Sequence, residues 1–373
     1  MSATNLQNFS GDVQIRGTTL IKANTATDNL AIGTEAGLTA QGNNTIAIGS
    51  AAGKTSQGTV SVAVGYQAGE TAQGANATAV GRQAGETAQG VNSTAVGYQA
   101  GQTSQGNSTV AVGVNAGLTE QGSNSTAVGR AAGQTSQGVS AVAVGDNAGN
   151  SEQGSQSVAV GVTAANVKQG SRAVAVGYLA GQVSQGADAT AVGFFAGATK
   201  QGASATAVGV QAGQVSQGQF AVAVGVYAGI TVQGAQAVAI GRFAGATSQG
   251  TYSVAVGSSA GQTSQGAQAT AVGHFAGRSE QGNYTVAVGS SAGMTSQGGQ
   301  ATAVGFLAGN SEQESYATAV GRAAGTTSQG QYATAVGYLA GKSEQATIAV
   351  AVGAQAGETS QGTQAIAMGF RAG

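Results

Sequence analysis

The chain has 373 residues, with 65 glycines, 7% charged residues, a formal net charge of −1 and no proline, cysteine or tryptophan. Without cysteine it can form neither a disulfide nor a cysteine-ligated metal site, and its near-zero charge gives no electrostatic basis for binding nucleic acid or an anionic membrane. No apolar run approaches the roughly 18 residues of a membrane span, so membrane insertion is not expected.

Residues 1–29 differ in pattern from the rest of the chain. They lack the basic and apolar regions of a signal peptide, so no secretion signal is expected. Residues 13–17 and 19–22 alternate as in a short hairpin or a degenerate first coil. Because the end of a solenoid exposes unpaired strand edges, we predict that residues 1–29 form an N-terminal cap and attachment segment, which would contact a capsid or fibre-base protein.

Residues 30–373 consist of one repeat of sixteen residues. Its Ala-Val-Gly glycine recurs without a slip from Gly33 to Gly369, and we number this glycine position 0. Positions −4 to −1 combine small and β-branched residues and predict a short strand, strand A, while positions +5 to +8 predict a second, strand B. The frequent glycines argue against helix. We therefore predict an all-β parallel β-solenoid, or β-roll, with sixteen-residue coils.

Period-two alternation predicts which positions face inward. In strand B, positions +5 and +7 carry charged residues such as Lys54 and Glu120, so these positions are expected to face solvent and positions +6 and +8 to face inward. Position +8 is glutamine in every coil, which predicts an inward ladder of hydrogen-bonded amides. Its representatives are Gln73, Gln89 and Gln105. In strand A, the larger apolar side chains at −1 and −3 are expected inside.

This assignment leaves positions −2 and −4 as the outer face of strand A. Beyond the first coil the face carries only alanine, serine and threonine. An uncharged ribbon of small residues favours packing of strand A against copies of itself from other chains. The candidate trimer-interface residues are Ala63, Ala79, Ala95, Ala111 and Ala127. Alternatively, alanine merely tolerates exposure there, and a dimer would explain the stripe as well as a trimer does.

The repeat resembles two known families. Residues 61–65, Ser-Val-Ala-Val-Gly, and 45–49, Thr-Ile-Ala-Ile-Gly, resemble the repeat of the YadA-type head domain of trimeric adhesins. The longer phrase Ala-Ile-Gly-x-x-Ala-Gly-x-x-x-Gln-Gly is similar to the glycoprotein repeat of chloroviruses and related giant DNA viruses. The adhesin resemblance implies a left-handed parallel β-roll with three chains around one axis. The secretion signal and membrane anchor of the bacterial adhesins have no counterpart in this sequence, which favours the viral family.

The sequence offers little for catalysis. The one histidine, His274, lies in a variable turn, and the acidic residues are scattered singly, with Glu312 and Glu314 the nearest pair. Stacking of neighbouring coils could pair Glu70 with Glu86, but neither has a nucleophile or base partner nearby, and no phosphate-binding glycine loop occurs. We predict a non-enzymatic protein that uses no cofactor and no metal ion.

Aromatic residues concentrate in the second half of the chain, at positions +1, +2 and +11. They predict either a recognition surface or ladders of rings that stack between coils and stabilise them. The candidate recognition residues are Tyr178, Phe194, Phe195, Tyr227, Phe243 and Phe275.

These patterns together predict a structural fibre or spike, a stiff homotrimeric rod on a virion surface or outside the cell. The expected partners are further copies of the chain, in a trimer and in end-to-end assembly. The alternatives are an adhesin that binds a host receptor or surface glycan, and an extracellular filament subunit that stacks end to end. Ice binding would require outward-facing threonines at +6, which contradicts the predicted faces.

Overall fold

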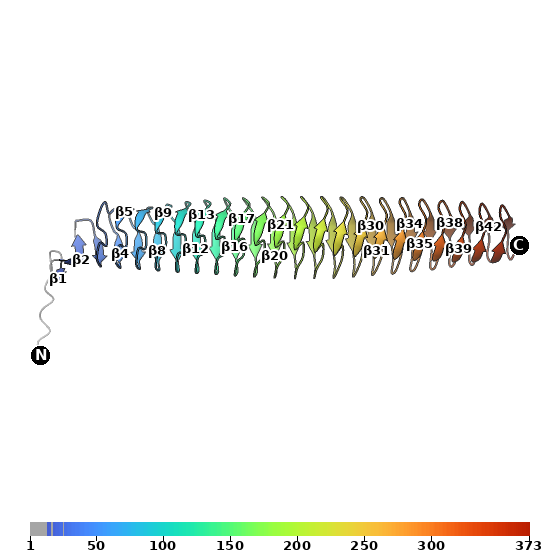
Figure 1. The fold of residues 1–373 in the computed structure, drawn as a ribbon, viewed down its shortest axis with the longest axis horizontal. Helices are drawn as coiled ribbons and strands as arrows, with labels where there is room; N and C mark the ends of the chain where they lie inside the picture. Colours follow the sequence, from blue (N-terminus) through green and yellow to red (C-terminus); the bar gives the residue numbers. More distant parts are fainter. Residues whose placement is uncertain (1–12, 16–17, 25) are drawn as a thin grey trace, which may run out of the picture. The chain divides into compact units, whose positions relative to one another are not determined.

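The computed structural model describes residues 13–15, 18–24 and 26–373. The chain divides into two compact units, residues 1–179 and 180–373. In each unit, short strands and turns follow one another in a regular series of coils (Figure 1). The described ranges contain no helix, so none of them could cross a membrane as a helix. The predicted all-β parallel solenoid is confirmed in each unit.

The first unit begins with antiparallel pairing. β1 (Val13–Ile15) pairs with β2 (Thr18–Asn24), and β2 pairs with β3 (Asn29–Ile32), which is strand A of the first coil. The hairpin expected from the alternating residues is therefore present. Residues 1–12, 16–17 and 25 of the predicted cap lie outside the described residues, and its capping and attachment roles stay predictions.

From β4 onward every strand has three residues. In the first unit, the strand-A segments are β4 (Ile46–Ile48), β6 (Val62–Val64), β8 (Thr78–Val80), β10 (Thr94–Val96), β12 (Val110–Val112), β14 (Thr126–Val128), β16 (Val142–Val144), β18 (Val158–Val160) and β20 (Val174–Val176). The strand-B segments are β5 (Thr55–Gln57), β7 (Thr71–Gln73), β9 (Thr87–Gln89), β11 (Thr103–Gln105), β13 (Thr119–Gln121), β15 (Thr135–Gln137), β17 (Ser151–Gln153) and β19 (Val167–Gln169).

The second unit continues the same two series. Its strand-A segments are β22 (Thr190–Val192), β24 (Thr206–Val208), β26 (Val222–Val224), β28 (Val238–Ile240), β30 (Val254–Val256), β32 (Thr270–Val272), β34 (Val286–Val288), β36 (Thr302–Val304), β38 (Thr318–Val320), β40 (Thr334–Val336), β42 (Val350–Val352) and β44 (Ile366–Met368). Its strand-B segments are β21 (Val183–Gln185), β23 (Thr199–Gln201), β25 (Val215–Gln217), β27 (Thr231–Gln233), β29 (Thr247–Gln249), β31 (Thr263–Gln265), β33 (Ser279–Gln281), β35 (Thr295–Gln297), β37 (Ser311–Gln313), β39 (Thr327–Gln329), β41 (Ser343–Gln345) and β43 (Thr359–Gln361).

Within each unit, a strand pairs in parallel with the equivalent strand of the neighbouring coils. β8 and β10 align Ala79 with Ala95, and β9 and β11 align Gln89 with Gln105. Each repeat position therefore forms a row of identical or similar residues that runs from coil to coil.

The faces of strand A are the reverse of those predicted. Position −2 points into the coil, and position −4, such as Ser93, is buried as well. The β-branched residues at −3 and −1, such as Thr94 and Val96, are half-exposed instead. The candidate trimer-interface residues Ala63, Ala79, Ala95, Ala111 and Ala127 are all 0% exposed within a single chain. The prediction that these alanines form the outer face is wrong.

The reason is the narrowness of the coil interior. It contains the alanines of positions −2 and +3, the small residue at −4 and the glutamine at +8. A Cβ on Gly85, at +4, would lie 2.7 Å from Cδ of Gln89, so the space opposite the glutamine is already filled. An interior packed this closely accepts a methyl group but not a valine side chain, and alternation then places the valines outside.

Strand B departs from regular alternation at +7. Ala88 has a φ of 56°, in the left-handed region, so the side chains on either side of it do not share one face. Thr87 and Ala88 are both exposed, while Gln89 is buried. The predicted inward orientation of position +6 is therefore wrong, because a left-handed residue interrupts the period of two.

The glycine at position 0 permits the close stacking of coils. Gly81 has a φ of 131°, and a Cβ there would lie 2.5 Å from the carbonyl oxygen of Gly97 in the next coil. A side chain at this position would be strained and would push neighbouring coils apart. The repeated glycine is thus required by backbone packing.

Candidate interaction surfaces

The outer face of strand A is an apolar stripe in each unit. We use this name for positions −3 and −1, the first and last residues of each three-residue strand-A segment. Every one of them is Val, Ile, Thr or Met, and none carries a charge. Ile46 and Ile240 are 38% and 40% exposed. Position −3 is Thr in nine of the 21 strands, so the stripe is an uncharged and mainly apolar surface, and a surface of this kind marks an association site. Sequence reasoning missed it because it placed these side chains inside the coil.

The glutamines at +8 tie the two strands of each coil together. Gln73, Gln89 and Gln105 are only 2–3% exposed. Nε2 of Gln89 donates a hydrogen bond to the carbonyl oxygen of Thr78 at 2.9 Å, across the coil. Nε2 of Gln73 also donates to Oε1 of Gln89 at 3.0 Å, whereas Oε1 of Gln73 and of Gln105 accepts no hydrogen bond. The amide ladder therefore exists in this part of the chain but runs in pairs.

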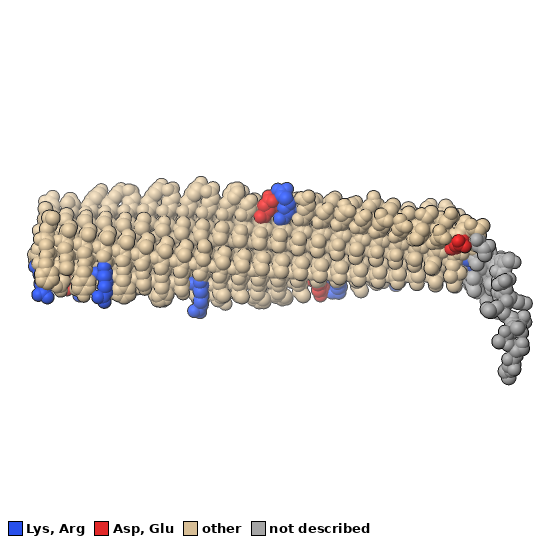
Figure 2. Space-filling view, turned by 180° about the vertical axis from the view of Figure 1, so that it is seen from behind, with Lys and Arg blue, Asp and Glu red and all other residues tan. Residues whose placement is uncertain are grey.

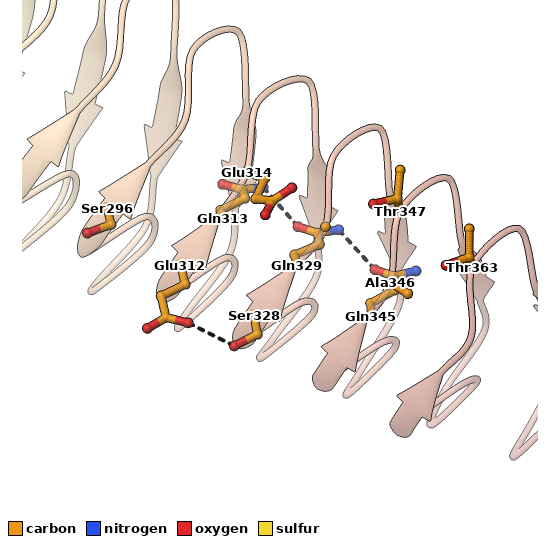
Figure 3. Close-up of a pocket in the computed structure, with 11 residues that line it drawn as sticks. Ser296, Glu312, Gln313, Glu314, Ser328, Gln329, Gln345, Ala346, Thr347 and Thr363 are labelled. Carbon is orange, nitrogen blue, oxygen red and sulfur yellow. Dashed lines mark hydrogen bonds between the residues drawn. The ribbon is translucent and has the colours of Figure 1, made fainter.

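In the second unit the same ladder is continuous from Gln281 to Gln361. Figure 3 shows Gln313, Gln329 and Gln345 following one another in this row. Each amide donates to the next coil and to the carbonyl across its own coil. Buried polar groups need such partners, so the ladder is a structural element and offers no site for a ligand.

A hollow of about 430 Å³ lies beside this ladder. It adjoins Glu314 and Ala346, the two residues that replace the glycine at +9. Glu312 accepts a hydrogen bond from Oγ of Ser328 at 2.9 Å (Figure 3), and Glu314 accepts one from the backbone N–H of Gln331 at 2.9 Å. Both carboxylates are engaged within the coils, and the side chains that line the hollow include no histidine, lysine or cysteine.

The candidate recognition residues occupy the turn from strand A to strand B. At position +1, Tyr178 and Phe194 are 48% and 46% exposed. At position +2, Phe195 packs edge-on against Phe194, with ring centroids 4.6 Å apart. Tyr227 and Phe243, from successive coils, are stacked with centroids 4.9 Å apart.

Phe275, the last of these residues, also has close neighbours. Its ring lies 3.8 Å from that of His274, and the guanidinium of Arg278 lies 4.8 Å from its centroid. The half-buried rings at +2 therefore contact other side chains, as the stacking alternative requires.

A second aromatic row was not among the candidate residues. It lies on the turn from strand B to strand A, at position +11, in the second unit. Its members are Phe220, Tyr252, Tyr284, Tyr316 and Tyr332, between 42% and 57% exposed. Their sequence spacing could have revealed them, because the first four recur at every second coil.

Charged side chains are few on the face shown in Figure 2, and some acidic and basic groups lie side by side there. One ion pair joins Nζ of Lys54 to Glu35 at 2.8 Å. The hydrogen bond to Glu35 and then its negative charge raise the pKa of Lys54 above the ordinary lysine value. In the part of the chain that the structure describes, no three His, Cys, Asp or Glu side chains are grouped as a metal site would need.

Comparison with known protein families connects this geometry to one repeat. Residues 88–116 and 233–260 match the YadA head domain repeat. Each match contains two successive strand-A segments and the strand B between them. No curated protein matches the chain.

The chain is therefore similar to YadA-like adhesin repeats. This repeat and the β-solenoid fold are those of structural adhesin repeats, not of enzymes. Together they fit a fibrous, adhesin-like structural protein at a surface or outside the cell.

Proposed function

We propose that the chain is the subunit of a homotrimeric structural fibre or spike, joined through the apolar stripe of strand A. The observation that carries the proposal is the stripe itself, since its aliphatic side chains stay half-exposed in the single chain. The interface residues are thus those at −3 and −1, in place of the alanines at −2. Identical chains present the same side chains at the same coil spacing, so the stripes match in register.

The gain from burial increases with the number of coils in contact. Full burial of a valine side chain contributes about 1.5–3 kcal/mol relative to exposure, so a half-exposed one gains about 1 kcal/mol. Position −1 therefore gives about 1 kcal/mol for each coil of each chain, and position −3 adds about as much in the twelve coils where it is Val or Ile instead of Thr. Association costs about 4–15 kcal/mol, so a stable contact needs roughly five or more coils in register.

The choice of three chains draws on the similarity to the YadA head repeat, since burial alone would also fit a dimer. A virion surface is the location we propose, from the likeness of the longer repeat phrase to chlorovirus-type glycoproteins. In this proposal residues 1–29 cap the first coil and attach the fibre to a base protein.

An adhesin that binds a host receptor or glycan is the second candidate, which the exposed aromatic rows favour.

The oligomeric state tests the interface directly. Val80→Lys together with Val96→Lys places two charges on the apolar stripe. Ala72→Lys together with Ala88→Lys is the matched control, since +7 faces outward and carries lysine naturally at Lys168. We expect sedimentation to give a trimer for the wild type and the control. In the stripe variant the untouched coils hold the trimer together, and hydrogen exchange should accelerate in residues 78–96 relative to the control. A monomeric wild type, or a stripe variant whose exchange matches that of the control, would contradict the proposed interface.

Ice binding was excluded above because the threonines at +6 were predicted to face inward, and since they face outward it has to be considered again. Position +7 lies on the same surface and carries charges such as Glu152, Lys168 and Lys200. Such charges interrupt the row, so the surface is not the uniform array that ice binding would need. The fibre remains the function that the structure favours.

A further inference from the structure

The second unit carries an alternating row of rings and amides at position +11. The aromatic members Phe220, Tyr252, Tyr284 and Tyr316 recur at every second coil, and the intervening coils carry Gln236, Gln268 and Gln300. We call these residues the aromatic–amide row. The rings and amides are all exposed. The row lies on a turn, so it does not depend on the trimer contact through the apolar stripe.

The backbone at this position is unfavourable for a large side chain. Tyr252, Tyr284 and Tyr316 have φ values of 59°, 61° and 66°, in the left-handed region that bulky residues avoid. In the first unit the same position holds asparagine at residues such as Asn76 and Asn92, the residue type that tolerates this conformation. Tyrosine is therefore less favourable than asparagine there, and the same conformation recurs at +2 and +7 of the repeat, for example at Phe243 and Val232.

Stacking does not offset this loss of folding stability at the first three rings of the row. Within residues 180–373, no other ring and no cation packs on Phe220, Tyr252 or Tyr284. They are 56–57% exposed. Tyr316 differs, because it stacks on Tyr332 with centroids 4.8 Å apart. The structure of the single unit therefore gives no reason for three exposed rings in this conformation.

The rings are held at a fixed spacing. The backbone N–H of Tyr252 donates to the carbonyl of Ala235 at 3.0 Å, and that of Tyr284 donates to Ala267 at 2.9 Å, so each turn is tied to the preceding coil. Adjacent parallel strands lie about 4.8 Å apart, which places rings of alternate coils about 9.6 Å apart. The row therefore presents one ring for every two coils at a fixed spacing.

We propose that the aromatic–amide row binds a linear, neutral β-1,4-linked polysaccharide. In such a chain successive sugars are turned over, so every second sugar presents the same face, at a repeat close to the ring spacing. Each ring can then stack on one sugar of a disaccharide, while the glutamine between rings reaches the hydroxyls of the other. A hollow of about 340 Å³ between Tyr252 and Gln268 gives room for a sugar ring.

The polarity of the row selects a neutral polymer. Positions +9 to +11 carry no charge in the six coils from residue 218 to residue 300, so nothing there would pair with a carboxylate or sulfate on an acidic glycan. The amides are also able to reach across one coil. Nε2 of Gln300 donates to the hydroxyl of Tyr316 at 3.2 Å, so the glutamines can interact at the level of the neighbouring ring.

The test uses the full chain with cellohexaose and chitohexaose as probes, followed by tyrosine fluorescence and calorimetry. Tyr252→Ser with Tyr284→Ser removes two rings, and serine already occupies this position at Ser204, so the coils should fold. The control Tyr338→Ser removes a ring that is 46% exposed on the other turn. A spacing variant, Tyr252→Gln with Gln268→Tyr, keeps the composition but breaks the alternation.

We expect the wild type and Tyr338→Ser to bind at least one of the two oligosaccharides equally well. The double serine variant should bind about tenfold more weakly, since two aromatic contacts are lost, and the spacing variant should also be weakened. Maltohexaose, whose linkage gives a coiled chain, should not bind. The proposal is overturned if neither β-1,4 oligosaccharide binds, if the serine or spacing variant binds like the wild type, or if maltohexaose binds as well as the β-1,4 oligosaccharides.

Discussion

Two separate substitutions, one of an alanine and one of a valine, would test the reversed faces of strand A. Ala191, at −2, is 0% exposed, and its Cβ lies only 3.2 Å from the place where a Cβ on Gly197 would stand. Ala191→Val therefore forces two extra methyl groups into a filled interior. Val192, at −1, is half-exposed, so Val192→Ala removes methyl groups that are already partly in water.

The two substitutions should differ clearly in magnitude. Overpacking of a close-packed core costs about 1–3 kcal/mol. Val192→Ala removes partly exposed methyl groups, so it should cost about 1 kcal/mol or less within the single chain. Because solenoid stability is local, with each coil contacting only its neighbours, the effect is best measured near the substituted coil.

Hydrogen exchange of the amides in residues 183–201 provides that local measurement. Ala191→Val should accelerate exchange by about five- to 150-fold, the equivalent of 1–3 kcal/mol, and Val192→Ala by no more than about fivefold. If valine pointed inward, as the sequence predicted, the order would reverse, because Val192→Ala would open a cavity while Ala191→Val would add two methyl groups at the surface. That reversed order would refute the faces described here.

Two further predictions concern the glutamine ladder and the one perturbed lysine. Gln89→Ala should lower the local stability by about 1–3 kcal/mol, because the carbonyl of Thr78 and the amide of Gln73 lose a buried partner. Hydrogen exchange should therefore accelerate in residues 73–89. The control Gln99→Ala, at a half-exposed turn position, should change exchange little. For Lys54, the raised pKa means that the stabilisation by Glu35 is fully present below the unfolded pKa and is lost as pH rises through the higher folded pKa. Titration of Lys54 by NMR should therefore move to lower pH in Glu35→Gln, and an unchanged titration would show that the ion pair does not form in solution.

The sequence by itself determined the architecture of this protein. Because the repeat is unbroken from Gly33 to Gly369, the coil length, the two strands per coil and the parallel stacking follow from periodicity and from the β-branched and glycine positions. The burial of glutamine at +8 was also predicted, since +8 alternates with the charged positions +5 and +7. These features depend on local pattern, which a single chain displays directly.

Only the tertiary structure decided which faces point inward. Strand A has two uncharged faces, so alternation gives two solutions, and the expectation that the larger side chains lie inside chose the wrong one. The distance between the strands decides the matter, because the glutamine and the alanines already fill the interior. In strand B the left-handed residue at +7, such as Ala88, turns Thr87 outward, and no sequence rule marks an alanine for that conformation. The apolar stripe follows from the first of these packing decisions, which is why it could not be identified before the coils were stacked.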